Sequence, residues 1–426
     1  MSFSLEAGYN DTLLEISGQV GTIDGLLAGE DFPLDISGNL GDLLISMNGN
    51  IANLTDIPSG SVTLSLEVDS LSRLNTLAGT DLPDQGPLLF NGILNFTDSN
   101  NLRLNEINLQ LAELAITGDF AANTAGAVPM ITATLESDVL DLSPFMPEEA
   151  EEDVEFLFPR DPLPLASLAA VNADLTFNAN RIITPSVEVT ENELSISLND
   201  GNLRLANGSA IAGGNSSALI QLDTINDSQA RLSTDISGDS IMLELLPHEE
   251  DRWFTGGATT IAINGTGTGG SVAEIMGSLN GNILIQVGEA RMPNSGIDMF
   301  GADIILSTFN KLNPLSSQED FSLLECAVIN LPVDDGIIKL DRQIAVQTSK
   351  MHMVGSGEIN LKNEELNLGV KPYAKEGVGL NLSSIAGAAK IGGTLANPSP
   401  EIDAENAIKT GLSAGAAVAT GGLSLL

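Results

Sequence analysis

The apolar residues of this chain recur with a period of two in many short segments, and this pattern constrains the fold more than any other feature. In residues 61–68 every second side chain is apolar, at Val62, Leu64, Leu66 and Val68. The same alternation is found in residues 173–177, 194–198, 283–287 and 366–370. A strand turns successive side chains to opposite faces, so each segment predicts a β-strand with one apolar and one polar face. Such strands are typical of an antiparallel sheet that is wet on one side.

Turn signals separate these segments, and helix signals are few. Asn199-Asp200-Gly201 and Asp334-Asp335-Gly336 each lie between two apolar runs and predict tight hairpins. Only residues 71–77, 272–277 and 304–312 indicate helix, which is too little to cover both faces of a large sheet. We therefore predict a mainly β protein, a long twisted antiparallel sheet of about twenty strands that forms a curved groove. The few short helices would lie at its edges or ends.

One break interrupts the strand pattern. Five prolines lie between Pro144 and Pro164, together with an acidic run at residues 148–153. Prolines and like charges favour a solvated linker or long loop. We therefore predict four parts: an N-terminal β region at 1–143, the linker or loop at 144–164, a second β region at 165–405, and an apolar tail of small residues at 406–426.

Charge and cysteine content restrict the function classes. The chain has 17 Lys and Arg against 57 Asp and Glu, a net charge of −40. Binding to nucleic acid needs clustered cations, so we expect no nucleic-acid partner, and the same charge opposes attachment to an anionic membrane surface. Cys326 is the only cysteine, which excludes an intrachain disulfide, and its apolar surroundings predict a buried small hydrophobe. Residues 1–9 lack a signal-peptide pattern, and no segment reaches the ~20 apolar residues of a membrane-spanning helix.

Three motifs suggest chemistry but fit β-structure better. Residues 265–270 match the GxGxxG pattern of dinucleotide sites, yet the preceding strand is half-polar and the following helix is short, so we expect a flexible glycine turn. Met351-His352-Met353 cannot converge on one metal ion, because a strand points the histidine away from the methionines. The acidic run lacks the spaced oxygens and the glycine of a calcium loop. We therefore predict no enzymatic activity, no catalytic residue, no metal ligand and no cofactor.

Several blocks, taken together, resemble the C-terminal region of AsmA-like proteins. Phe158–Leu165 resembles the start of that region, and residues 194–214 resemble the hairpin that follows it. Further blocks follow in the same order, at Gly265-Thr266-Gly267, Asp334–Ile337, Gly355–Leu361 and Ile391–Pro398. The resemblance extends from Phe158 to Ile402, and the N-terminal third has a compatible pattern.

The resemblance implies an envelope protein of Gram-negative bacteria, with an inner-membrane anchor and a long periplasmic β-structure. It implies a groove like that of bridge-type lipid-transfer proteins and a role in moving phospholipid toward the outer membrane. This chain departs from the pattern because it shows no anchor helix. We expect either a piece of a longer protein or a chain that works with a separately anchored inner-membrane partner. The expected location is the periplasm, at the cell envelope, with a membrane at one or both ends.

An aliphatic sheet face would suit lipid contact. Exposing an acyl chain of ~16 carbons to water costs about 13 kcal/mol, at ~0.8 kcal/mol per methylene. Aromatic residues make up only 4% of the chain, so its apolar surface is mainly aliphatic. The same residues would serve equally well in an ordinary sandwich or barrel core. The candidates for acyl-chain contact are Val62, Leu64, Leu66, Leu194, Ile196, Leu198, Ile283 and Ile285.

The C-terminal tail is a second candidate site. Residues 411–426 are uncharged and, as a helix, would reach ~24 Å, which is short of a bilayer core. The tail would either touch a membrane or form a plug or a disordered end. The candidates for membrane contact are Leu412, Val418, Leu423, Leu425 and Leu426. Two further functions stay open: a chaperone-like scaffold that pairs sheet edges with assembling outer-membrane proteins, and a carbohydrate-active or adhesive β-solenoid.

Overall fold

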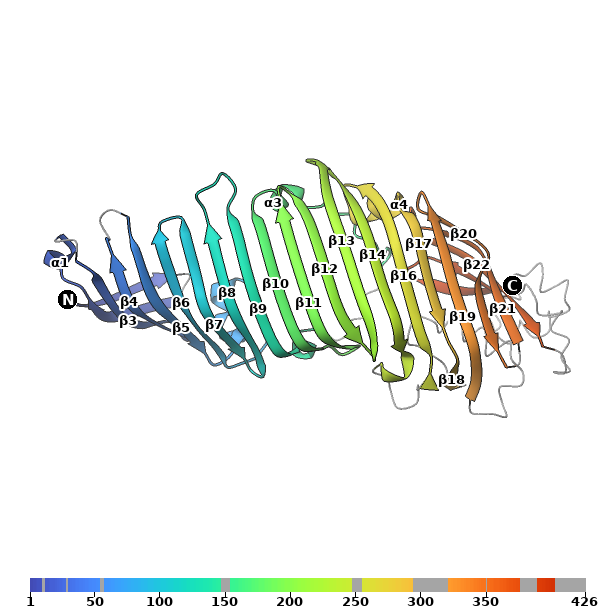
Figure 1. Ribbon diagram of the computed structural model, residues 1–426, viewed down its shortest axis with the longest axis horizontal. Helices are drawn as coiled ribbons and strands as arrows, with labels where there is room; N and C mark the ends of the chain where they lie inside the picture. The colour runs from blue at the N-terminus through green and yellow to red at the C-terminus, as the bar shows by residue number, and fades with distance from the viewer. Residues whose placement is uncertain are drawn as a thin grey trace, which may run out of the picture. The chain divides into compact units, whose positions relative to one another are not determined.

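The computed structural model describes residues 1–9, 12–27, 30–53, 57–146, 154–246, 255–293, 321–349, 351–375 and 389–402. Its 24 strands belong to one open, mostly antiparallel sheet, accompanied by a few short helices (Figure 1). This confirms the prediction of a mainly β fold. The chain divides into two compact units. Unit 1 comprises residues 1–148 and 166–209, and unit 2 comprises residues 149–165 and 210–426.

Unit 1 contains the first eleven strands and most of the twelfth, in chain order. They are β1 (Ser2–Tyr9), β2 (Thr12–Val20), β3 (Phe32–Leu40), β4 (Leu43–Ala52), β5 (Ser59–Val68), β6 (Leu88–Asp98), β7 (Asn101–Leu111), β8 (Leu114–Asn123), β9 (Met130–Asp141), β10 (Asn172–Ile183), β11 (Glu188–Asn199) and β12 (Asn202–Ile211). The helical turns are α1 (Ile23–Leu27), η1 (Leu71–Leu74), α2 (Asn75–Ala78), η2 (Ser143–Phe145) and α3 (Leu165–Leu168). A boundary between the two units falls within α3 and another within β12. From β1 to β9 each strand pairs antiparallel with the next.

Unit 2 contains the remaining strands. They are β13 (Gly214–Asn226), β14 (Gln229–Met242), β15 (Thr255–Gly256), β16 (Ala258–Gly269), β17 (Asn280–Val287), β18 (Ala290–Pro293), β19 (Phe321–Asp334), β20 (Ile337–Thr348), β21 (Met351–Asn360), β22 (Glu365–Ala374), β23 (Ala389–Gly393) and β24 (Pro398–Ile402). Two helical segments accompany them, η3 (Leu243–Leu245) and α4 (Val272–Gly277). Every pairing described within this unit is antiparallel.

One strand pair differs from the predicted antiparallel pattern. β9 and β10 are parallel, with Met130 opposite Asn172 and Asp141 opposite Ile183. Parallel neighbours need a crossover of a dozen or more residues, and the proline-rich segment 144–164 lies in that crossover. Alternation of apolar residues is the same in both kinds of pairing, so the sequence pattern could not reveal this reversal. The domain boundaries given above stay predictions.

The local predictions for turns and helices agree with the structure where it describes them. Asp200 and Gly201 both have positive φ, 48° and 80°, as the two-residue turn between β11 and β12 requires. Asp335 and Gly336 form the equivalent turn between β19 and β20, with φ of 48° and 71°. Residues 71–77 fall in η1 and α2, and residues 272–277 form α4. The helix predicted at 304–312 lies outside the described residues.

Two local predictions are wrong. Cys326 is exposed, because a β-bulge between Leu324 and Cys326 shifts the register of β19 against β20 and turns the cysteine to the polar face. The glycine-rich motif at residues 265–270 is not a turn either. Its first five residues belong to strand β16, and the strand ends at Gly269.

Candidate functional site

In unit 1 the apolar residues of neighbouring strands lie in register. Val62 of β5 is opposite Gly49 of β4 and Leu94 of β6, and Leu66 is opposite Ile45 and Phe90. Opposed residues of paired strands share one face of the sheet. The apolar alternates of β5 therefore extend a common apolar face across its neighbours.

The candidates in β11 belong to a similar set of rows. Leu194, Ile196 and Leu198 are opposite Phe177, Leu175 and Ala173 of β10. Across the parallel pair, these β10 residues are opposite Leu135, Ala133 and Ile131 of β9. Of the candidates in unit 1, Val62 and Leu198 are buried, while Leu64, Leu66, Leu194 and Ile196 stay partly accessible.

In unit 2 the two candidates Ile283 and Ile285 lie in two parallel rows of isoleucines. One row joins Ile236, Ile263, Ile283 and Leu331 across β14, β16, β17 and β19. The other joins Ile261, Ile285, Ile329 and Ile344 across β16, β17, β19 and β20. All eight side chains are only partly buried. We call this surface the isoleucine stripe.

One margin of the isoleucine stripe is covered near η3. Leu243, Ala290 and Leu324 form a buried cluster, and Val287, Ala327 and Val346 pack against it. The Glu244 carboxylate accepts a 2.7 Å hydrogen bond from the backbone N–H of Gly256 and so ties η3 to β15. We call this group the η3 margin.

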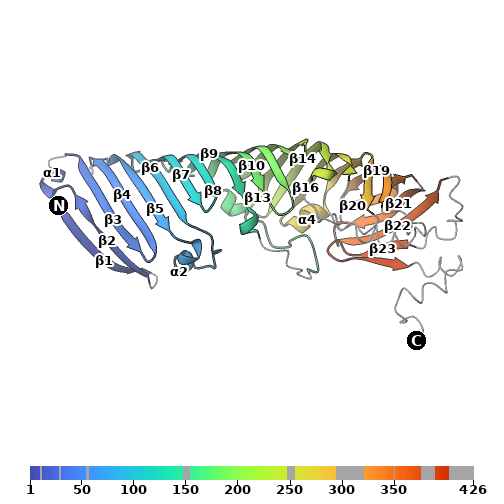
Figure 2. The same ribbon diagram turned by 90° about the horizontal axis from the view of Figure 1, so that it is seen from below.

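The other margin is covered by α4, which lies directly on the glycines of β16 (Figure 2). A Cβ atom at Gly267 would lie 2.4 Å from the carbonyl oxygen of Ile275, and one at Gly269 would lie 2.5 Å from the Cβ of Glu274. The alternating glycines therefore allow a helix to approach the sheet backbone. The Ser271 hydroxyl caps this helix by accepting a 3.2 Å hydrogen bond from the N–H of Glu274.

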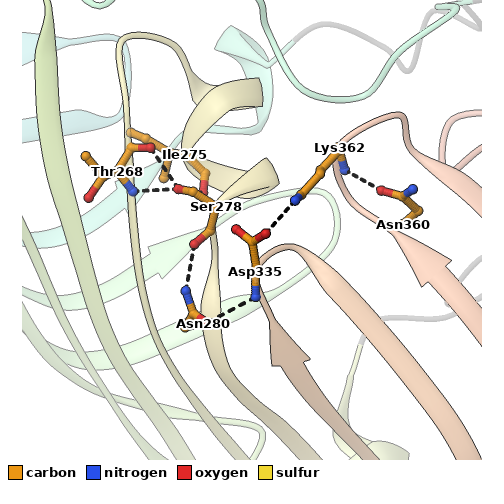
Figure 3. A network of polar contacts seen from close by, with 7 residues as sticks. All are labelled: Thr268, Ile275, Ser278, Asn280, Asp335, Asn360 and Lys362. Atoms are coloured by element: carbon orange, nitrogen blue, oxygen red, sulfur yellow. Dashed lines mark hydrogen bonds and ion pairs between the residues drawn. The ribbon is translucent and has the colours of Figure 1, made fainter.

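A polar network holds the C-terminal end of α4 against two strand turns (Figure 3). The Ser278 hydroxyl accepts a 2.7 Å hydrogen bond from the N–H of Thr268. Asn280 bridges the two structures, since its amide donates to the Ser278 carbonyl and its side-chain oxygen accepts from the N–H of Asp335. Asp335 in turn pairs with Lys362 at 2.7 Å. The network therefore joins α4 to the β19–β20 and β21–β22 turns.

A segment of the crossover, Val154–Leu165, runs beside α4 and is bound at several points; we call it the strap. The Pro159 carbonyl accepts a 3.0 Å hydrogen bond from the N–H of Ala273, and the N–H of Leu163 donates to the Gly270 carbonyl. The Val154 carbonyl accepts a 2.8 Å bond from the side chain of Asn397. These bonds fix the strap to unit 2.

Glu364 makes the central attachment of the strap. Its side chain is only 1% exposed, and its carboxylate accepts hydrogen bonds from the backbone N–H groups of Leu157, at 2.5 Å, and Phe158, at 3.2 Å. Phe158 packs, with Met276 and Leu279, against a buried cluster. We call this cluster the strap margin; its buried members are Val333, Ile338, Leu340, Ile359 and Leu361.

The opposite face of the sheet is polar. On β19 the Glu325 carboxylate pairs with Lys375 at 2.7 Å and accepts a short hydrogen bond from Gln347. These two partners, Lys375 first, hold the pKa of Glu325 below its ordinary value. In unit 1 the Asp119 carboxylate accepts hydrogen bonds from the Asn105 side chain and the Glu106 N–H. The polar groups of this face bond to one another across strands.

Of the remaining motifs singled out in the sequence, the structure describes some and leaves others outside the described residues. His352 is exposed and Met353 is buried, as the alternation predicts for those two residues. Within the described part of the chain, no three His, Cys, Asp or Glu side chains gather as metal ligands, and no helix is long and apolar enough to cross a membrane. The acidic run at 148–153 and the tail candidates, Leu412, Val418, Leu423, Leu425 and Leu426, lie outside the described residues. Glu364 was not predicted from the sequence, because a single glutamate in a polar turn has no local pattern and its partners lie more than 200 residues away.

The mostly antiparallel sheet, with apolar rows in register within each unit, defines a large mainly β protein. The chain belongs to the AsmA family, whose family model matches residues 33–343. It is similar to AsmA family protein YhjG of Escherichia coli strain K12, with 24% identity over 444 residues. That match covers 97% of this chain and 63% of the relative, so the chain spans less than two thirds of the relative's length. No solved structure matches the chain. The family match confirms the resemblance seen in the sequence.

Proposed function

We propose that the chain is a non-enzymatic protein of the cell envelope whose apolar sheet face binds phospholipid acyl chains and lets them pass between the inner and outer membranes. The observation that supports this most directly is the register of the apolar rows. Within each unit, apolar side chains of successive strands lie opposite one another, and most of them stay partly accessible. Such rows offer an acyl chain contact on every strand that it crosses.

The energetics support a surface of this kind. An acyl chain of ~16 carbons would lose about 13 kcal/mol of hydrophobic stabilisation in water, so a path between membranes needs apolar contact at each step. A row of similar aliphatic residues gives nearly the same contact on each strand. Adjacent strands lie about 4.8 Å apart, so a chain that moves along a row meets closely spaced equivalent positions.

The isoleucine stripe is bounded on both sides along β19. On β19, Ala327 packs on the η3 margin and Leu331 packs on the strap margin, with Ile329 between them. Four residues of strand span about 13 Å. Nonbonded carbon atoms approach to about 4 Å, so this width suits two or three hydrocarbon chains side by side.

Photocrosslinking from matched positions tests the proposal. A benzophenone amino acid at Leu64, Ile196 or Ile285 lies on the apolar face, while the same probe at Thr63, Ser195 or Gln286 lies on the opposite face. After irradiation in Gram-negative cells, we expect phospholipid adducts from the first three positions and few from the others. Equal lipid adducts from both faces would contradict the proposal.

The same experiment separates the main rival function. A chaperone-like scaffold that assists assembly of outer-membrane proteins would bind chains through its strand edges or faces. It would give protein adducts without lipid at Leu64, Ile196 and Ile285. We place the chain in the periplasm, associated with the envelope, and propose that a membrane lies at one or both ends of the path. An anchored inner-membrane partner would attach it if this chain does not carry the anchor itself.

A further inference from the structure

The strap covers apolar surface that would otherwise extend the isoleucine stripe. Val333 pairs with Ile338, which pairs with Ile359, so these residues share the apolar face with Ile283 and Ile329. They are buried under side chains that include Phe158 of the strap, Met276 of α4 and Leu395. The boundary of the accessible apolar surface in unit 2 therefore depends on the position of the strap.

Glu364 has the properties of a residue that sets this position. A carboxylate offers two acceptor oxygens, and here each oxygen accepts from a different backbone N–H of the strap. The two donors belong to neighbouring residues, Leu157 and Phe158, so the pair of bonds fixes the strap in direction as well as in place.

The other bonds of the strap lie on either side of the Glu364 pair. It contains no strand; single backbone or side-chain groups bond to unit 2 at Val154, Pro159 and Leu163, and Leu165 at its end is buried. Arg160 lies over the ring of Phe156 at 3.7 Å, which stiffens the strap internally but does not attach it to the sheet. Release of the Glu364 bonds would therefore free the central part of the strap.

We infer that Glu364 is a specificity-determining residue: through the strap and Phe158 it limits the width of the acyl path in unit 2 and so favours two-chain over four-chain phospholipids. This inference rests on the proposed function. Movement of the strap off Val333 would lengthen the accessible run on β19 by two residues, about 7 Å. That increase gives room for one or two further hydrocarbon chains.

A competition between two anionic phospholipids that differ in the number of acyl chains tests the inference. The chain is incubated with vesicles that contain equal amounts of phosphatidylglycerol, with two chains, and cardiolipin, with four, and is then re-isolated and its lipid quantified by mass spectrometry. Glu364→Gln keeps the side-chain shape but leaves one oxygen acceptor and sets an amide group against the other N–H. Phe158→Ala keeps the backbone bonds to Glu364 and removes the aromatic ring that packs against the strap margin. Glu365→Gln is the matched control, since its side chain is exposed.

We expect the wild-type chain and Glu365→Gln to retain phosphatidylglycerol in preference to cardiolipin. Glu364→Gln and Phe158→Ala should reduce the ratio of bound phosphatidylglycerol to bound cardiolipin by about tenfold. A tenfold change corresponds to about 1.4 kcal/mol of binding free energy. If Glu364→Gln does not fold, the ratio of phosphatidylglycerol to cardiolipin retained by Phe158→Ala tests the inference. An unchanged ratio in the folded variants would overturn this inference and leave the proposed function intact. Retention of neither lipid by the wild-type chain would overturn the proposed function itself.

Discussion

The carboxylate of Glu364 accepts a 3.2 Å hydrogen bond from the backbone N–H of Phe158, a residue 206 positions earlier in the chain. This contact joins the turn between β21 and β22 to the crossover that leaves β9. Because the Glu364 side chain is almost fully buried, water cannot replace it as the acceptor. Glu364 therefore anchors the centre of the strap, between its bonds at Val154 and at Pro159 and Leu163.

Replacing Glu364 by Ala should loosen the strap and α4 together. The substitution removes the acceptor of the N–H groups of Leu157 and Phe158, and one intramolecular hydrogen bond contributes about 0.5–1.5 kcal/mol. We expect the free energy of local opening, measured by amide hydrogen exchange at Leu163 and Ala273, to fall by a similar amount. Glu365→Ala should leave exchange at both amides unchanged. Equal protection in the two variants would show that Glu364 does not hold the strap.

The glycines of β16 give a second prediction. In Gly267→Ala the new Cβ would lie 2.4 Å from the carbonyl oxygen of Ile275, so α4 must move away from the sheet. Overpacking of this kind costs about 1–3 kcal/mol. We expect weaker exchange protection at the Ser278 amide, which bonds to Glu274 in α4. Gly208→Ala in β12 is the control, because a Cβ there meets nothing within 4 Å. Loss of stability in the control alone would contradict this account of the motif.

Stability at low pH should depend on Glu325. Its pKa is lowered from 4.5, first by the hydrogen bond with Lys375 and then by that with Gln347. A lowered carboxyl pKa adds stability above the unfolded-state value, and this contribution is lost as the pH falls through the folded-state pKa. We expect Glu325→Gln to lower the melting temperature at pH 7, and this loss should shrink as the pH falls below the ordinary carboxyl pKa. Lys375→Met should reproduce this pattern, and a loss that is larger at pH 3 would refute it.

The exposed thiol of Cys326 allows a test of the bulge in β19. Because the bulge turns this side chain to the polar face, a maleimide should label the native protein without denaturant. We expect the labelled mass to appear for most of the folded chain at neutral pH. Labelling only after denaturation would mean that Cys326 is buried, as its apolar neighbours in the sequence had indicated.

Local patterns in the sequence were sufficient to predict the strands and several turns. The period of two at residues 61–68 and 194–198 reflects side-chain geometry within one strand, so it holds whatever the partner strand. The turns at Asp200-Gly201 and Asp335-Gly336 are equally local, since both residues of such turns need positive φ. Helix α4 also has a local signal, in the serine that caps it.

Features that depend on contacts between distant residues could not be predicted in this way. The parallel pairing of β9 with β10 leaves no mark in the alternation of either strand. The prolines of segment 144–164 indicated a linker or loop, whereas the attachment of Val154–Leu165 depends on Glu364 and Asn397, both far along the chain. The bulge at Cys326 likewise arises from its pairing with β20. The site is therefore a product of register and packing, of which the sequence showed only the apolar alternates.

The central claim, that the apolar face binds phospholipid, is tested most directly by native mass spectrometry of the chain purified without detergent from Gram-negative cells. We expect the bare protein to be accompanied by adducts with the masses of phospholipids, and these adducts should decrease when Leu64, Ile196 and Ile285 are replaced together by Glu. The same three substitutions at Thr63, Ser195 and Gln286 should leave the adducts in place. A wild-type chain that shows only its bare mass, with no phospholipid in a solvent extract of the same sample, would contradict the claim.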